Sequence, residues 1–136
     1  MAVIDTDFLV SYLRGKENAD EIFKKLLNEH KALKTTIFNA AELYKGCYKM
    51  KNVVKGLIDV KNLLSSLKEI LIFDEMAVQE YAKISIDLEK KGEPIGVFDE
   101  LIASICLANN EILYSGNTQH FEKVPGLLIC NWRDLT

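Results

Sequence analysis

Short apolar runs alternate along this chain with longer segments in which apolar residues recur every three or four positions. Uninterrupted apolar or β-branched runs are typical of buried strands, whereas recurrence at helical spacing predicts helices with one buried face. The runs predict five strands, at residues 2–4, 32–36, 70–73, 112–115 and 127–130. The spacing predicts helices near residues 8–13, 17–30, 37–50, 53–68, 76–91 and 101–108.

Strands that alternate with helices throughout a chain predict a three-layer α/β/α domain, here with a five-stranded, mostly parallel sheet. The helix at 101–108 is apolar nearly all round, so we expect it to pack between layers. A chain of 136 residues without internal repeats or low-complexity linkers is expected to form one domain, residues 1–136. Its composition, 49% hydrophobic and 27% charged, is typical of a globular protein.

The sequence carries no signal for export or membrane insertion. Its first apolar run has about four residues and no basic flank, and no stretch approaches the roughly 18 apolar residues of a membrane span. We therefore expect a soluble, cytoplasmic protein. The cysteines are widely spaced among apolar neighbours without a C-x-x-C pair, and we expect Cys47, Cys106 and Cys130 to be reduced core thiols.

Three acidic residues stand where a strand passes to a helix or where a buried helix begins: Asp5, Glu42 and Asp99. Ligands of open α/β sheets bind at the carboxyl ends of the strands, and Asp5 ends the first strand. Each residue also has a structural interpretation. Asp5 could start a turn, with Asp7 capping the first helix. Asn39 and Glu42 have the spacing of a capping box, and Asp99 is a natural cap for the helix after it.

The three carboxylates are expected to meet at one edge of the sheet, and this changes the balance between the two interpretations. Two carboxylates about 5 Å apart repel by roughly 3 kcal/mol at an effective dielectric of 20, so three pairs approach the stability of a whole domain. Protons or a hard divalent cation must neutralise such a cluster, and oxygen ligands suit Mg²⁺ or Mn²⁺. A cation held in this way is typical of enzymes that hydrolyse phosphodiesters. His30 and His120 lack metal-ligand spacing, and we assign neither to a metal. His120 is either a rim residue that contacts phosphate or water or a structural residue, and we favour the structural role.

Basic residues near Glu42 are candidates for nucleic-acid contact. The net charge of −3 does not attract a polyanion by itself, so any such binding requires a local basic patch. Lys45 and Lys49 follow Glu42 at helical spacing and share its face, with Gly46 between them. They are either phosphate contacts or a solvated helix face. Arg14, at the end of the first helix, is a second candidate for the same rim.

A resemblance to a known family extends over essentially the whole chain. The motifs that carry it occur in the family's order: Asp5-Thr6-Asp7-Phe8-Leu9, Glu42-Leu43-Tyr44-Lys45-Gly46, Gly92 through Pro94-Ile95 to Asp99-Glu100-Leu101-Ile102-Ala103, Ser115-Gly116-Asn117-Thr118-Gln119-His120-Phe121, and Val124-Pro125-Gly126-Leu127 up to Trp132. Each motif alone is weak, but the ordered set resembles PIN-domain ribonucleases of the VapC toxin type.

The resemblance implies a five-stranded parallel sheet between helices and a Mg²⁺- or Mn²⁺-dependent endonuclease that cuts single-stranded RNA. It also implies a homodimer and a small antitoxin partner that occludes the site. By position, the acidic ligands would be Asp5, Glu42 and Asp99. Asn117 stands where the family often has a fourth acidic residue, so we expect a first metal ion at Asp5 and Asp99 and a weakly held second one.

Two further residues and two rival functions complete the prediction. Thr6 and Asp7 sit beside the first acidic ligand. Asp5-x-Asp7 after a hydrophobic strand also resembles the nucleophile motif of haloacid-dehalogenase-type phosphatases, but Phe8 stands where that class has Thr or Val, and its late paired acidic motif is absent. The other rival is a non-enzymatic acidic regulatory domain.

Apolar residues on more than one face of 53–67 support the homodimer.

Overall fold

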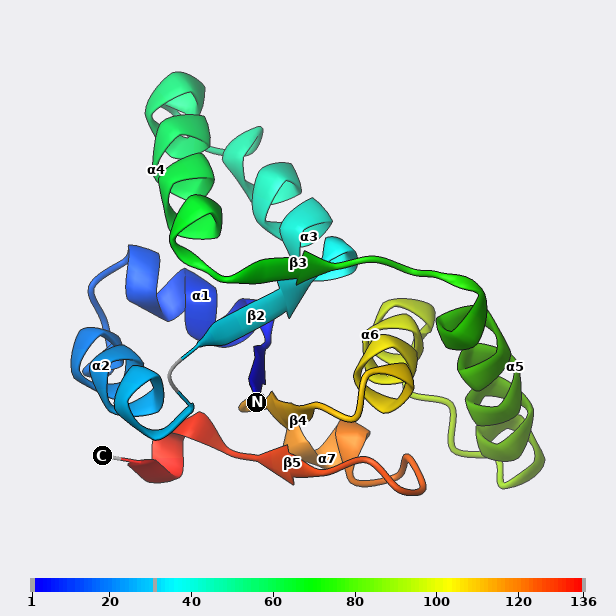
Figure 1. Cartoon of the computed structure of the whole chain (residues 1–136). Coiled ribbons are helices and arrows are strands. Elements are labelled where there is room, and N and C mark those ends of the chain that lie inside the picture. The colour runs from blue at the N-terminus through cyan, green and yellow to red at the C-terminus, as the bar shows by residue number, and fades with distance from the viewer. Residues whose placement is uncertain (1, 31, 136) are drawn as a thin grey trace.

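A five-stranded parallel sheet forms the centre of the computed structural model, which describes residues 2–30 and 32–135 (Figure 1). Its strands run in the order β3-β2-β1-β4-β5, and every neighbouring pair is parallel. The bounds are β1 Ala2–Ile4, β2 Leu33–Thr36, β3 Glu69–Leu71, β4 Ile112–Tyr114 and β5 Ile129–Cys130. The predicted α/β class and the five-stranded sheet are confirmed.

Helices cover both faces of the sheet, as the three-layer prediction requires (Figure 1). They are α1 Thr6–Leu13, α2 Ala19–His30, α3 Ile37–Cys47, α4 Val53–Ser66, α5 Glu75–Lys90, α6 Val97–Ala108 and α7 Thr118–Phe121, followed by the 3₁₀ helix η1 Trp132–Leu135. Side chains of a strand point alternately to its two faces. Accordingly Ile4 packs into the core under α1 to α4, and Val3 packs into the core under α5 and α6.

The first helix begins earlier than predicted, because no residue separates the end of β1 from the helix cap. Asp5 itself is the N-cap of α1, and its Oδ1 accepts a hydrogen bond of 2.9 Å from the backbone nitrogen of Thr6. The prediction that Asp7 is the cap is therefore wrong. Asp7 lies in the first turn, where its negative charge faces the positive end of the helix dipole.

The predicted caps of α3 and α6 are also wrong. Thr36 caps α3, and Asn39 completes the capping box with it, so Glu42 is not part of a box and lies one turn further along. Gly96 occupies the N-cap position of α6 with a φ of 100°, a value that favours glycine, and Asp99 lies in the first turn. Glu42 and Asp99 are thus free of the capping roles that offered a structural explanation for them.

Two short helices and one thiol differ from the prediction. The single-turn α7 and the 3₁₀ helix η1 are too short to show helical periodicity, and the sequence did not predict them. In η1 the Trp132 ring is fully buried and packs edge-on against Phe8, with 5.1 Å between the ring centroids. Cys47 and Cys106 are buried as expected, but Cys130 is exposed, because it lies on the edge strand β5.

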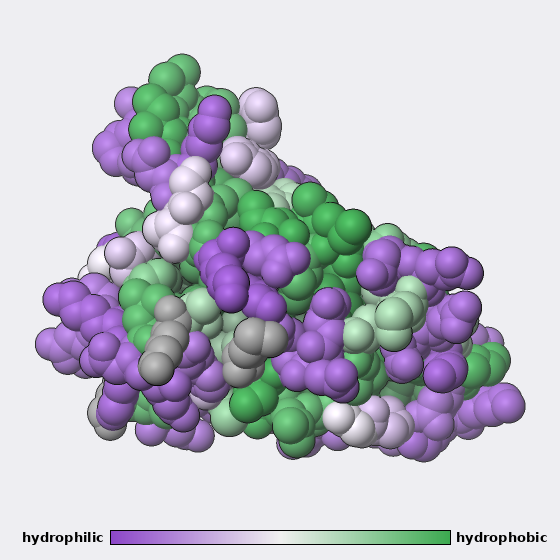
Figure 2. Space-filling view, viewed as in Figure 1, coloured by the Kyte–Doolittle hydropathy of each residue, from purple (hydrophilic) through white to green (hydrophobic). Residues whose placement is uncertain are grey.

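Apolar side chains remain on the surface at several places, and one group of them lies on and beside α4. The outer side of α4 exposes Val54 and Ile58, and the end of α3 adds Tyr48 and Met50. Figure 2 shows hydrophobic atoms over the projecting α4. No helix within residues 2–30 or 32–135 is long and apolar enough to cross a membrane. The homodimer remains a prediction.

Candidate active site

Asp5 is the buried centre of a polar network at the carboxyl edge of the sheet. Its Oδ1 accepts a hydrogen bond of 2.8 Å from Asn39 Nδ2 as well as the bond from Thr6, and its Oδ2 accepts one of 2.6 Å from Ser115 Oγ. Burial raises the pKa of Asp5 from its ordinary value of 3.8 to about 7, partly opposed by the Ser115 hydrogen bond and reinforced by the charge of Asp7. Asp5 therefore keeps its proton up to near neutral pH, and a bound cation would favour the ionised carboxylate.

Glu42 joins this network through a threonine. Thr6 Oγ1 donates a hydrogen bond of 2.6 Å to Glu42 Oε1 and accepts one of 2.9 Å from Asn39 Nδ2. Asn39 is fully buried. Through its bonds to Asp5 and Thr6 it links Asp5 and Glu42 in one hydrogen-bond network. Burial raises the pKa of Glu42; the Thr6 hydrogen bond opposes this shift, and the charge of Asp99 adds to it.

Asp99 lies in the first turn of α6, and its carboxylate contacts two side chains from the segment after β4. Its Oδ2 lies 2.9 Å from His120 Nδ1 and 3.2 Å from Asn117 Nδ2. His120 Nδ1 also lies 2.9 Å from Asn117 Nδ2, so it donates to Asp99 in one tautomer and accepts from Asn117 in the other. The structural role expected for His120 stays a prediction, and its contacts place it beside a predicted ligand. Only the fold brings α7 to α6, so sequence spacing gave no signal of this contact.

Ser115 links the two halves of the network. It donates to Asp5 Oδ2 through Oγ, and the same oxygen accepts a hydrogen bond of 2.9 Å from the backbone nitrogen of Asn117. The end of β4 therefore fixes Asp5 and the residue that contacts Asp99 at the same time. The structure brings together all of the residues predicted at this edge: Asp5, Thr6, Asp7, Glu42, Asp99 and Asn117.

Asp7 closes the edge with help from the C-terminal segment. Its Oδ2 accepts a hydrogen bond of 2.7 Å from the backbone nitrogen of Gly116 and lies 3.6 Å from Arg133 Nη1. Arg133 also donates from Nε to Glu17 at 3.2 Å and lies over the Trp132 ring. A Cβ at Gly116 would collide with the Arg133 guanidinium and with Oδ2 of Asp7, so a side chain here would displace these groups. Arg133 lies far from Asp7 in the sequence, and no local motif indicated its role.

The donor set fits a hard divalent cation that keeps part of its water shell. In the part of the chain that the structure describes, no three acidic, histidine or cysteine side chains converge as a complete metal-ligand set. Yet the charge of Asp99 acts on both Asp5 and Glu42, and each of the three carboxylates offers oxygen atoms. Mg²⁺ commonly binds through one or two carboxylates, with waters and substrate phosphates as its remaining ligands. The arrangement suits such an ion better than a fully protein-bound one.

An open groove of about 550 Å³ runs beside Glu42 along α3. Its lining includes the two predicted basic residues and an aromatic ring from α6: Thr6, Ala41, Glu42, Lys45, Gly46, Lys49 and Phe98. Lys45 and Lys49 are both exposed, so their ammonium groups are accessible to a phosphate at this groove. The sequence did not single out Phe98.

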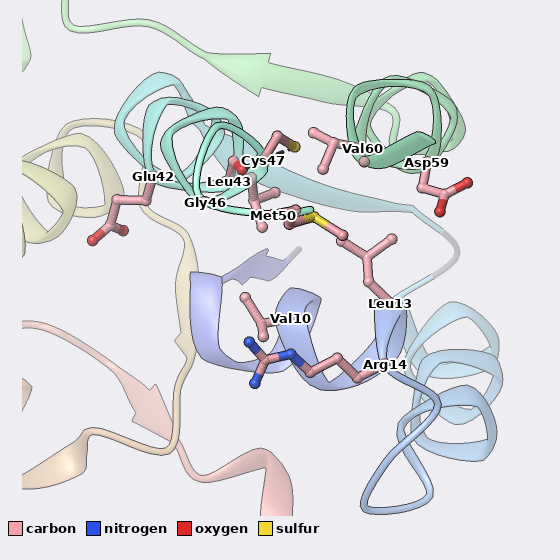
Figure 3. A pocket seen from close by; sticks show the side chains of 11 residues that line it. Val10, Leu13, Arg14, Glu42, Leu43, Gly46, Cys47, Met50, Asp59 and Val60 are labelled. Atoms are coloured by element: carbon pink, nitrogen blue, oxygen red, sulfur yellow. Dashed lines mark hydrogen bonds between the residues drawn. The ribbon is translucent and has the colours of Figure 1, made fainter. Parts of the chain in front are cut away.

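Arg14 does not line this groove. It lines a second, mainly apolar cavity of about 200 Å³ between α1, α3 and α4. Figure 3 shows Leu13 and Met50 pointing into this space, while Glu42 and Asp59 point outward at its two ends. Glu42 and Gly46 line both the groove and this cavity, and the place of Arg14 on the rim of the site stays a prediction.

Comparisons with known proteins agree with this geometry. The family model described as "PIN domain" matches residues 2–127. The chain is 29% identical to ribonuclease VapC2 of Rickettsia felis and 28% identical to the tRNA(fMet)-specific endonuclease VapC of Salmonella typhimurium, with 96% of each chain covered in both cases. Its fold is similar to the crystal structure of VapBC2 from Rickettsia felis bound to a promoter DNA fragment, with a TM-score of 0.87, 27% identity, and coverage of 96% and 98% of the two chains.

Proposed function

The chain belongs to the PIN-domain family, and from this premise we propose that it is a divalent-metal-dependent endoribonuclease, the toxin of a toxin–antitoxin pair. The single observation that carries the proposal is the hydrogen-bond network that connects Asp5, Glu42 and Asp99, in which the pKa of Asp5 is raised to about 7. Family membership favours this function over the phosphatase alternative.

Asp5 and Asp99 would hold a Mg²⁺ or Mn²⁺ ion, and the side-chain oxygen of Asn117 is a weaker third donor. Bound there, the ion would supply charge neutralisation at the scissile phosphate and a lowered pKa for the attacking water. The chain's own contribution is orientation. Asn39 and Ser115 each donate a hydrogen bond to one oxygen of Asp5, and His120 contacts one oxygen of Asp99. These contacts fix the orientation of both carboxylates.

Glu42 is suited to accept the proton of the attacking water. Thr6 occupies Oε1, which leaves Oε2 as the accepting oxygen. A base is most effective when its pKa approaches the working pH, and the pKa of Glu42 is raised by burial and by Asp99. This role needs no change in the position of Glu42, because Thr6 and Asn39 hold the side chain in place.

RNA and an antitoxin are the proposed partners, and they use different surfaces. Lys45 and Lys49 would contact phosphates in the groove beside Glu42. The apolar cavity between α1, α3 and α4 suits an apolar anchor of the antitoxin, with Arg14 and Asp59 available for charged contacts at its rim. An antitoxin segment in that cavity would lie against Glu42 and so obstruct the site. A second copy of the chain is the third proposed partner.

Cleavage of a structured RNA by the purified protein tests the proposal. We expect cleavage with Mg²⁺ or Mn²⁺ and none with EDTA. The variant Glu42→Gln keeps an acceptor for Thr6 but loses the charge, so activity should be lost while the melting temperature stays nearly unchanged. Glu89→Gln, an exposed change on α5, serves as the matched control and should cleave normally. Equal cleavage with metal and with EDTA, or normal cleavage by Glu42→Gln, would contradict the proposal.

A further inference from the structure

Phe98 is an exposed aromatic residue at the mouth of the candidate active site. It lies in the first turn of α6, directly before Asp99, and 44% of its surface is accessible. It lines the same groove as Lys45, Lys49 and Glu42. An aromatic face beside two ammonium groups suits a ligand that has both a flat apolar surface and anionic groups.

Two edge-to-face aromatic contacts in series support the Phe98 ring. Phe38 packs edge-on against it, with 5.6 Å between ring centroids and an interplanar angle of 62°. Phe38 in turn packs edge-on against Phe73, with 5.5 Å between the centroids. Both supporting rings are half-buried and belong to the core beneath α5 and α6. A ring supported in this way loses little further freedom when it binds a flat ligand.

We propose that Phe98 is a stacking platform for an unpaired nucleobase, and that it gives the groove its preference for single-stranded RNA. The inference rests on the proposed ribonuclease function and adds a binding residue to it. Every base has a π face that an aromatic side chain can cover, and stacking of this kind tolerates different bases. Bases within a duplex are already stacked on their neighbours, so a paired strand cannot use the platform without being opened.

The order of residues along α6 places the stacked base close to the chemistry. Phe98 and Asp99 are consecutive, so their Cα atoms are about 3.8 Å apart. Phe98 lines the same groove as Thr6 and Glu42, so a base stacked on it lies beside the carboxylate network. Lys45 and Lys49 line this groove too, where they can contact the sugar-phosphate backbone of the same strand. A single strand thus satisfies all three features together, whereas an apolar protein surface leaves the lysines unused.

A binding measurement without cleavage tests the platform. The probe is a short single-stranded RNA with 2′-O-methyl sugars and one 2-aminopurine, mixed with the full-length protein in EDTA. Stacking on Phe98 should quench the 2-aminopurine fluorescence. Phe98→Ala and Phe98→Leu should weaken binding by about fivefold to a hundredfold and remove the quenching, whereas Phe98→Trp should keep both. Leucine separates stacking from simple apolar burial, and Ile86→Ala, an exposed change on α5, is the matched control that should bind like wild type.

Three outcomes would overturn the inference. The first is a Phe98→Leu variant that binds and quenches like wild type. The second is equal weakening of single-stranded and double-stranded RNA. The third is a change in sedimentation of Phe98→Ala without a change in RNA affinity, which would make this face an interface between copies of the chain. Wild-type quenching without cleavage in Mg²⁺ would contradict the proposed nuclease but support the platform, whereas metal-dependent cleavage with unchanged affinity in Phe98→Ala would do the reverse.

Discussion

Charged side chains are buried at both ends of the parallel strands, the amino edge and the carboxyl edge of the sheet, but their charges have different partners at the two ends. At the amino edge, Lys34 of β2 is buried and donates a hydrogen bond of 2.8 Å to Glu111, which precedes β4. Glu69 adds a longer ionic contact of 3.8 Å from the start of β3. Each charge at this edge thus has a partner of opposite sign.

At the carboxyl edge the buried charge has partners of the same sign. The charges of Asp7 and Asp99 act on Asp5, and its hydrogen bonds come from neutral groups. Arg133 lies 3.6 Å from Asp7. A compensated buried pair is a structural feature, whereas an uncompensated cluster costs stability and is retained where a ligand supplies the missing charge. The contrast within one sheet therefore supports the proposal that the carboxyl edge carries the active site.

The largest effect should come from neutralising the carboxyl edge. Asp99→Asn and Asp5→Asn should each lower RNA cleavage by about 100-fold or more, since each removes a proposed ligand of the ion. Their melting temperatures should stay equal to wild type or rise, because one repelling charge is removed. Cleavage rates and thermal melts of these variants check both parts, with exposed Asp20→Asn as the control. Loss of folding in both variants would break the comparison.

The amino edge should respond in the opposite way. Lys34→Met leaves Glu111 buried without its cation, and we expect a loss of about 3–5 kcal/mol in the free energy of unfolding. Cleavage per folded molecule should be unchanged. Combining Lys34→Met with Glu111→Leu removes both charges and should recover most of the stability. Urea unfolding of the single and double variants measures this, and a fully stable Lys34→Met would show that the pair contributes nothing.

The pH dependence of stability gives a third contrast. Burial raises the pKa of Asp5 from 3.8 to about 7 in the folded chain, so its stabilising contribution is fully present below pH 3.8 and is lost as the pH rises through about 7. Without metal, the free energy of unfolding of wild type should therefore fall more between about pH 4 and pH 7 than that of Asp5→Asn, because the unfolded chain loses this proton at a lower pH than the folded chain. Parallel curves for the two proteins would contradict the raised pKa.

A smaller effect concerns the groove beside Glu42. Replacing Lys45 and Lys49 by alanine should reduce the slope of log affinity for single-stranded RNA against log salt by at most about 1.4, or roughly 0.7 for each contact. Lys61→Ala combined with Lys90→Ala, exposed changes on α4 and α5, provides the matched control. Equal slopes for both double variants would mean that Lys45 and Lys49 form a solvated helix face and do not contact RNA.

Hydrophobic patterning was sufficient to predict the layers of this fold and the edge that carries the site. Each strand coincided with a short run of apolar or β-branched residues, and Asp5 directly follows the first. Helix starts were less predictable, because a strand can pass into a helix without a loop. Local sequence rules that favour Asp7 or Asn39 as caps cannot detect that Asp5 and Thr36 already occupy those positions.

Contacts between distant segments could not be predicted from local patterns. His120 meets Asp99, and Arg133 meets Asp7, only because the segments after β4 and β5 return to the same edge. The helices that hold these two side chains are a single turn each, which is too short for periodicity. Phe98 belonged to a recognisable motif, but its exposure depends on how α6 packs against α3, and a lone aromatic residue in an apolar segment predicts burial.

Binding of Mn²⁺ tests most directly the claim that the carboxyl edge is held open for a cation. Calorimetric titration at pH 7.5 should show saturable binding to wild type, which Asp5→Asn and Asp99→Asn each abolish or weaken by at least about tenfold. Lys34→Met should bind as wild type does while it remains folded. Binding that persists unchanged in both aspartate variants, or a wild-type protein that does not bind Mn²⁺, would contradict the account.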